Sequence, residues 1–260
     1  MTKGRTLVLC YHAVSEDWRS ELAVTPGQLT WQVAHILRRG YRPVTFIDAM
    51  TTPANGRRVA ITFDDAYRSV FELALPVLRR LGAPATVYAP TDWIDRDEPM
   101  RWAGIDQWVG TADERELVPM SWEELRRVQD EGWEVGSHTC SHPHLTHLDD
   151  ARLSVELSRS KDACEEALDR PCRSLAYPYG DEDDRVLAAT VAAGYAAAGA
   201  LPTVPSLSQT FRWPRVGIYR WDGRSRFVLK LSPTVAAARG LPLRRWIDPL
   251  AKRIRGGSQT

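Results

Sequence analysis

The fold is decided by the stretch Arg58-Val59-Ala60-Ile61-Thr62-Phe63-Asp64-Asp65, an apolar run that ends in two acids. Branched and aromatic residues in such a run are typical of a buried strand. A second strand-like run, Trp133-Glu134-Val135-Gly136, leads in the same way into Ser137-His138-Thr139-Cys140-Ser141-His142. In α/β folds the C-terminal ends of the strands form the edge where active sites collect. The sequence therefore predicts that the two acids and the two histidines face one site.

This group of residue types indicates a metal site. Two imidazoles and a carboxylate suit a borderline divalent ion such as Zn²⁺, and three protein ligands with one open position are typical of a catalytic zinc site. The second aspartate is then free to take a proton from a metal-bound water. There are simpler alternatives, because an H-x-x-x-H spacing on a helix usually marks two solvated histidines and an Asp-Asp pair often forms a cap or turn. Pro143 argues against a helix here.

Strand-like and helical patterns alternate along the chain, which predicts a mostly parallel sheet. The predicted strands are 6–11, 43–46, 58–63, 85–89, 133–136, 174–176, 196–199 and 216–219. The predicted helices are 28–39, 70–81, 121–131, 151–168 and 184–193. A connection over 91–120 is long enough to be functional or disordered. It carries Trp93, Trp102 and Trp108, whose rings either stack on sugars or bury apolar area.

Three motifs make the pattern specific. Thr62-Phe63-Asp64-Asp65, then Ser137-His138-Thr139-x-Ser141-His142-Pro143-His144-Leu145, then Ala176-Tyr177-Pro178-Tyr179-Gly180 resemble the first three motifs of the polysaccharide deacetylases. This family is also known as the NodB-homology proteins or family 4 carbohydrate esterases. The resemblance extends over about residues 5–220. It implies an α/β fold, a deformed (β/α) barrel of about seven strands, and a metal-dependent removal of acetyl groups from amino-sugar polymers or glycoconjugates.

The resemblance also implies roles for individual residues. Asp65, His138 and His142 would be the metal ligands, and Asp64 the general base. The metal would most simply be zinc, with cobalt, nickel and manganese as alternatives. Tyr179 would offer its backbone N–H to the oxyanion of the reaction, although Tyr-Pro-Tyr-Gly can also be a plain turn. The expected substrate contacts are Trp102, Pro178 and Tyr179.

Two departures from the family pattern concern the general acid and a supporting arginine. No histidine follows His147, although many members carry their acid in a late strand. The strand predicted over 6–11 leads into His12, and a barrel brings its first and last strands side by side. A circularly permuted order, similar to that of the poly-N-acetylglucosamine deacetylases, would make His12 the acid that protonates the leaving amine. The alternative is a histidine that merely caps the strand.

Ala176 stands where many members carry an arginine at the start of the third motif. The run Arg212-Trp213-Pro214-Arg215-Val216 resembles a late "PR" segment of the permuted branch, whose arginine orients the base carboxylate. Arg215 is therefore a candidate for the missing role. The alternative is an exposed surface arginine.

Composition predicts one barrel over residues 1–240 and a basic tail over 241–260. A chain of 260 residues suits a single α/β barrel, and a net charge of +1 gives no electrostatic reason to expect nucleic acid. The tail mixes basic and apolar residues, which suits either a helix packed on the barrel or contact with an anionic membrane surface. The sequence shows no apolar leader or membrane-spanning run, which predicts a cytoplasmic protein, at the inner membrane face if the tail binds there.

The expected function is that of a metal-dependent hydrolase that removes N-acetyl groups from an amino sugar in a glycan or glycoconjugate. One alternative is hydrolysis of a non-sugar C–N bond, as in relatives that resemble imidases and allantoin-processing enzymes. Another is a glycan-binding barrel without catalysis. The presence of Asp64 and Asp65 together with both histidines argues against a silent protein.

Overall fold

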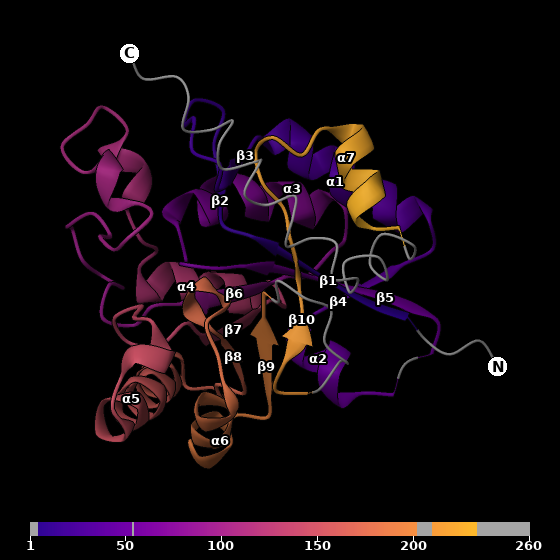
Figure 1. Cartoon of the computed structure of the whole chain (residues 1–260). Coiled ribbons are helices and arrows are strands. Elements are labelled where there is room, and N and C mark those ends of the chain that lie inside the picture. The colour runs from indigo at the N-terminus through magenta and orange to yellow at the C-terminus, as the bar shows by residue number, and fades with distance from the viewer. Residues whose placement is uncertain (1–4, 54, 202–209, 233–260) are drawn as a thin grey trace, which may run out of the picture.

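The computed structural model describes residues 5–53, 55–201 and 210–232. In this part of the chain a nine-stranded sheet curves around the centre of the molecule, with helices on its outside (Figure 1). All of its strand pairs are parallel, in the order β10-β9-β8-β7-β6-β5-β1-β11, with β4 on β5. The strands are β1 (Arg5–Tyr11), β4 (Arg42–Val44), β5 (Arg57–Phe63), β6 (Thr86–Ala89), β7 (Glu134–Ser137), β8 (Ser174–Ala176), β9 (Ala197–Ala200), β10 (Trp213–Pro214) and β11 (Val216–Gly217).

A single residue joins the two ends of this sheet. β10 pairs with β9 and β11 pairs with β1, and only Arg215 lies between β10 and β11. Its backbone N–H donates to the carbonyl of Ala200 at 3.0 Å. The segment that contains β10, Arg215 and β11 thus connects β9 to β1 across the gap in the sheet. The predicted barrel with adjacent first and last strands is confirmed.

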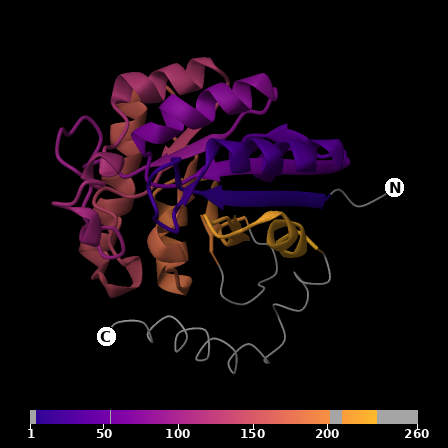
Figure 2. The same ribbon diagram turned by 90° about the horizontal axis from the view of Figure 1, so that it is seen from above.

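Helices cover the outside of the sheet. They are α1 (Pro26–Arg38), α2 (Phe46–Thr51), α3 (Leu75–Arg80), α4 (Trp122–Asp130), α5 (Asp150–Leu168), α6 (Asp184–Ala192) and α7 (Arg224–Lys230). α1 and α3 contact each other, and Figure 2 shows them on the same side of β1. Capping boxes formed by Thr25 with Gln28 and by Ser121 with Glu124 fix the starts of α1 and α4.

Shorter elements make up the remainder. The strands β2 (Ala13–Val14) and β3 (Ala23–Val24) pair with each other beside the main sheet. A π-helical turn η1 (Val70–Ala74) precedes α3, and four 3₁₀ turns are η2 (Asp106–Trp108), η3 (Glu114–Leu117), η4 (Leu145–His147) and η5 (Pro178–Gly180). The 91–120 connection therefore contains η2 and η3 rather than a regular helix.

The structure corrects several predicted elements. Phe46 was predicted to end a strand but begins α2, because the Thr45 side chain accepts the backbone N–H of Asp48 and caps a helix there. The helix predicted over 70–81 splits into η1 and α3, since Pro76 has no N–H to continue the regular pattern. The last strand ends at Gly217 rather than Tyr219. α2 and α7 had no predicted counterpart.

The core packs the inward residues of the strands against the helices. Leu9, Ile61, Val87 and Val135 from four adjacent strands are buried in one apolar cluster. In the described ranges no helix combines the length and the apolar character needed to cross a bilayer. The predicted basic tail over 241–260, and with it the predicted membrane contact, lies outside the described residues.

Candidate active site

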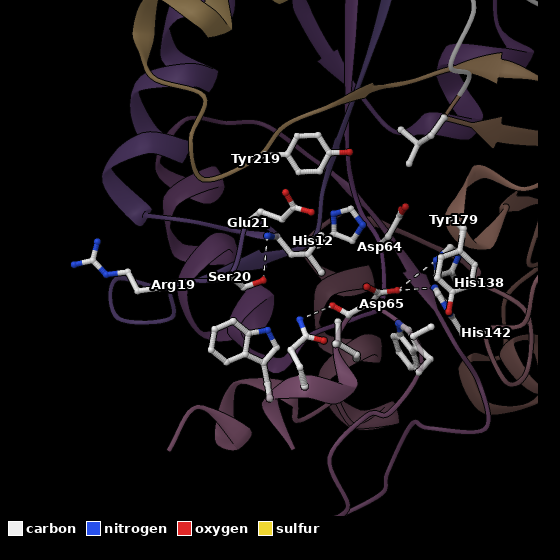
Figure 3. A pocket seen from close by; sticks show the side chains of 18 residues that line it. His12, Arg19, Ser20, Glu21, Asp64, Asp65, His138, His142, Tyr179 and Tyr219 are labelled. Carbon is white, nitrogen blue, oxygen red and sulfur yellow. Dashed lines mark hydrogen bonds and ion pairs between the residues drawn. The ribbon is translucent and has the colours of Figure 1, made fainter. Parts of the chain in front are cut away.

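Seven of the nine predicted site residues meet in one cleft of about 390 Å³ at the C-terminal ends of the strands (Figure 3). They come from different strand ends, since His12 follows β1, Asp64 and Asp65 follow β5, and His138 follows β7. The cleft lining includes His12, Asp64, Asp65, Trp102, His138, His142 and Tyr179. The order of the strands therefore brings together residues that are far apart in the sequence.

Asp65 lies between the two histidines. Its Oδ1 atom is 3.3 Å from Nε2 of His138 and 3.3 Å from Nε2 of His142, and all three residues are buried. Burial raises the pKa of Asp65, but the two imidazole contacts lower it further, so the net pKa lies well below the usual range. For His142 burial dominates and lowers the pKa. For His138 burial lowers the pKa, but the contact with Asp65 and the charge of Asp64 outweigh it, so the net pKa is raised.

These three residues fit a divalent metal ion. One ligand atom from each lies within 4.8 Å of the others, and Asp65 Oδ1 is a buried oxygen with no hydrogen-bond donor among the described residues. Ligands at about 2.0–2.1 Å from a tetrahedral zinc ion are separated by roughly 3.3 Å, which equals the two observed separations of 3.3 Å. Nitrogen and oxygen donors in this number leave a coordination position open.

Neighbouring groups orient both imidazoles. Nδ1 of His138 lies 2.8 Å from the carbonyl oxygen of Ala176. Since a carbonyl only accepts, Nδ1 carries a proton, and Nε2 is the nitrogen that faces Asp65. The indole of Trp102 stacks on the His142 ring, with centroids 4.2 Å apart and an interplanar angle of 18°. Ala176, where the resemblance led us to expect an arginine, thus contributes through its backbone.

Asp64 has a different partner. Arg215 donates from Nη1 to Oδ1 at 2.6 Å and from Nη2 to Oδ2 at 2.9 Å, and its side chain has 0% exposure. Burial raises the pKa of Asp64, but the guanidinium lowers it further, so the carboxylate stays ionised. The alternative of an exposed surface arginine is therefore excluded. The geometry agrees with the predicted orienting contact.

His12 lies beside Asp64 in the cleft. One of its ring nitrogens is within 4.8 Å of an Asp64 carboxylate oxygen, and its Nδ1 is buried without a hydrogen-bond partner in the described structure. The strand β1 places it there because β1 lies next to β5, with Tyr11 opposite Phe63. His12 therefore faces the cleft, which satisfies the geometric condition for the predicted acid.

The third motif forms the 3₁₀ turn η5 directly after β8. Tyr179 has a φ of 60°, and its ring lies at the rim, stacked on His144 at 4.0 Å and edge-on to His142 at 4.6 Å. Pro178, the first residue of this turn, is buried and is not part of the cleft lining. The structure thus brings Tyr179 to the cleft and leaves Pro178 behind it.

Backbone strain is concentrated at this site. Among the described residues, seven that are not glycine have positive φ, and five of them are Asp65, Ala66, Thr139, His142 and Tyr179. Such conformations cost of order 1–3 kcal/mol each and cluster at functional sites. A chain selected for stability alone would place glycine at such positions. The strain supports a functional role for these turns.

Sequence reasoning missed three residues that contact or line the site. Cys10 donates from Sγ to Oδ2 of Asp64 at 3.3 Å, and the ring of Tyr88 lies 5.5 Å from the Arg215 guanidinium. Tyr219 lines the cleft together with His12. Cys10 gives no sequence signal because an isolated cysteine in a strand is usually structural. Tyr219 ends the strand predicted over 216–219, so the rule that functional residues follow strand ends could have found it.

The tryptophan-rich connection over 91–120 forms one wall of the cleft. Trp102 and Trp108 line the cleft, whereas Trp93 packs edge-on against Trp102 with centroids 5.6 Å apart. One face of Trp102 is covered by His142. The connection is therefore ordered against the site, as a functional loop would be.

Comparisons with known proteins agree with this geometry. A sequence profile described as polysaccharide deacetylase matches residues 51–198, more than half of the chain. A chitooligosaccharide deacetylase of Bradyrhizobium sp. (strain ANU 289) is 40% identical over 148 residues, which are 54% of this chain and 54% of that protein. The poly-beta-1,6-N-acetyl-D-glucosamine N-deacetylase of Escherichia coli (strain K12) is 27% identical over 142 residues, 51% of this chain and 20% of that protein. The chain spans only 20% to 61% of the length of the curated relatives it matches.

Solved structures share the fold. A deacetylase of Streptococcus pyogenes in complex with acetate matches with a TM-score of 0.73 at 19% identity, covering 88% of this chain and 99% of that chain. A polysaccharide deacetylase from Bacillus cereus matches with a TM-score of 0.71 at 24% identity, covering 88% of this chain and 69% of that chain. Both confirm the predicted barrel.

Proposed function

Because this chain belongs to the polysaccharide deacetylase family, we propose that it hydrolyses N-acetyl groups on an amino sugar within a glycan or glycoconjugate. The observation that carries the proposal is the pair of neighbouring aspartates, one in contact with two imidazoles and one with a guanidinium, in a single open cleft. Relatives named as N-deacetylases of amino-sugar polymers support the choice of substrate class.

The proposed metal ligands are Asp65, His138 and His142. Zn²⁺ matches their two nitrogens and one oxygen best, although the donor set also accepts cobalt, nickel or manganese. When bound, such an ion would polarise the acetyl carbonyl and lower the pKa of a water molecule. The chain's own contribution is to keep Asp65 ionised and to hold Nε2 of His138 toward the site.

Asp64 is the proposed general base. Arg215 and Cys10 provide three donors to its two oxygens, and a carboxylate offers about four lone-pair sites. One site is then left to accept the proton of the attacking water. Arg215 fixes the plane of the carboxylate, so that this remaining site keeps one direction.

His12 is the proposed general acid. It would protonate the amide nitrogen as the C–N bond breaks, because without that proton the nitrogen would leave as an amide-type anion, which is a very poor leaving group. Its Nδ1 has no partner among the described residues, and its ring lies beside Asp64 at the cleft. The backbone N–H of Tyr179 is the proposed donor to the oxyanion. The strained φ at Tyr179 is the observation that favours a specific role for this peptide.

Acetate release from a panel of compounds tests the proposal. The purified chain, supplied with Zn²⁺, would be incubated with β-1,4- and β-1,6-linked N-acetylglucosamine oligomers, an O-acetylated xylan and two cyclic imides. We expect acetate and an equal amount of free amine from at least one amino-sugar oligomer. Ring opening of an imide without acetate release would favour the non-sugar hydrolase instead. Binding of the oligomers without turnover would favour a glycan-binding barrel without catalysis.

A further inference from the structure

We propose that Tyr219 binds a hydroxyl group of the sugar through its phenol, and that Gly217 leaves the space in which this phenol lies. The inference deepens the proposed function and rests on it. Tyr219 follows β11 and lines the cleft with His12 and Asp64. Figure 3 shows its ring above these two residues, with the hydroxyl on the side of Asp64.

The position of the phenol depends on a glycine two residues earlier. A Cβ atom at Gly217 would lie 2.7 Å from Oη and 3.0 Å from Cζ of Tyr219. Real Cβ atoms essentially never approach another atom below 3.0 Å, so any side chain at position 217 would push the ring away. Gly217 does not have a positive φ, and its backbone therefore gives no reason of its own for glycine. The space for the ring is the reason that the structure offers.

Lys230 and Asp222 also help to fix the position of Tyr219. The Lys230 ammonium lies 4.8 Å from the centroid of the Tyr219 ring, which is within cation–π range. Lys230 in turn donates to the Gly217 carbonyl at 2.8 Å and pairs with Asp222. The Asp222 carboxylate accepts the backbone N–H of Tyr219 at 2.8 Å. Lys230 thus contacts the ring, Asp222 holds the backbone of Tyr219, and the hydroxyl faces the cleft (Figure 3).

The polar groups of Tyr219 and Glu21 suit a sugar hydroxyl. Burial raises the pKa of Tyr219 to about 12, so the phenol keeps its proton at neutral pH and can donate. In the described ranges no protein group forms a hydrogen bond with this hydroxyl. Glu21, an exposed carboxylate, lines the same cleft beside it (Figure 3). A donor and an acceptor side by side match a hydroxyl group, which both accepts and donates.

The Tyr219→Phe variant tests this contact. With an N-acetylglucosamine oligomer that the wild type deacetylates, we expect KM to rise about tenfold with kcat within twofold, since one neutral hydrogen bond is lost from bound substrate. With 4-nitrophenyl acetate, which has no sugar hydroxyl, the variant should differ from the wild type by less than twofold. An unchanged KM for the oligomer, or equal losses on both substrates, would overturn the inference. Absence of acetate release by the wild type would instead contradict the proposed function.

Gly217→Ala provides a matched second variant. It leaves the phenol in the chain but displaces it, so it should raise KM for the oligomer as Tyr219→Phe does. In the Tyr219→Phe background, Gly217→Ala should add less than a twofold further loss, because the hydroxyl is already gone. Fully additive losses would show that the glycine acts in another way and would overturn the link between the two residues. Thermal unfolding of each variant identifies any that fail to fold, and the Tyr219→Phe result stands without them.

Discussion

Asp64 and Asp65 are neighbours in the chain, yet their surroundings give them different chemistry. Asp65 contacts two imidazoles, whereas Asp64 contacts a guanidinium and a thiol. The backbone turns between them with a φ of 69° at Asp65, which sends the two carboxylates to different partners. One acid is thereby suited to hold a metal ion and the other to move a proton.

The first prediction concerns the three proposed ligands. Asp65→Ala and His138→Ala should lose both bound metal and turnover, because two remaining ligands hold a divalent ion too weakly. Metal content by elemental analysis and acetate release should fall together. Thr139→Ser, which keeps the hydroxyl that accepts the His142 backbone N–H, is a nearby control that should retain metal. Full metal content in Asp65→Ala would rule out the proposed ligand set.

The second prediction separates binding from proton transfer. Asp64→Asn should retain most of the metal and bind substrate, while kcat falls by about 10²- to 10⁴-fold. The new amide side chain would still accept a hydrogen bond from Arg215 through its carbonyl oxygen but would be a far poorer proton acceptor. Steady-state kinetics together with metal analysis provide the measurement. A kcat equal to that of the wild type would move the base to another residue.

The third prediction concerns the pH dependence that Arg215 creates. Its charge lowers the pKa of Asp64 against the opposing effect of burial, so removal of the charge raises that pKa and less of the base is ionised in acid. In Arg215→Met the acid limb of kcat/KM should therefore move to higher pH, by about one to three units. Arg215→Lys keeps the charge but loses the two-point contact, and should shift less. An acid limb at the same pH in both variants and the wild type would contradict this.

The residues of the metal site could be predicted because each lies just after the end of a strand that the local sequence pattern predicts. Asp65, His138 and His142 each follow an apolar strand directly or within five residues. The contact between Arg215 and Asp64 spans 151 positions, and its burial depends on barrel closure. Only the resemblance to a family motif suggested it. Cys10 and Tyr219 could not be assigned from residue type alone, since both are common in structural roles.

At the scale of elements, the strand β1 is the one that brings the proposed acid to the site. It lies between β5 and β11 and delivers His12 beside Asp64. Strand order in space, rather than in sequence, therefore decides which residue can act as the acid.

The fourth prediction tests this placement. His12→Ala should retain metal, but kcat for an N-acetyl substrate should fall by about 10²- to 10⁴-fold, because the nitrogen would then have to leave as an amide-type anion. For an acetate ester with a good leaving group, kcat should fall far less, since that group needs little protonation. Parallel kinetics on the two substrates give the ratio. Equal losses on amide and ester would refute the assignment of the acid to His12.

Element boundaries were predicted well where capping residues or apolar runs are clear, as for 174–176 and 184–193. They were wrong where a local contact competed with the pattern. Thr45 stops a strand by capping a helix, and Pro76 breaks a helical repeat into a π turn and an α-helix. α7 was missed because the sequence offered no capping side chain at its start, where Gly223 stands.

At the scale of the whole molecule, the barrel class followed from alternating patterns and from family motifs. The adjacency of the first and last strands was expected as well. The details of the closure were not, because β10 and β11 are two residues each and carry no periodicity of their own. Their position follows from long-range pairing with β9 and β1 and from the burial of Arg215 between them. The same closure brings Arg215 to Asp64 and places Tyr219 at the cleft. Fold and site are therefore completed by the same late segment of the chain.

Metal-dependent acetate release tests the central claim most directly. The wild-type chain would be stripped with a chelator, divided, and assayed on an N-acetylglucosamine oligomer with and without one equivalent of Zn²⁺. We predict that acetate and free amine appear in equal amounts only after the metal is restored, and that Asp65→Ala stays inactive in both conditions. Equal acetate release by the stripped and the reconstituted protein, or none from any oligomer in either state, would contradict the account.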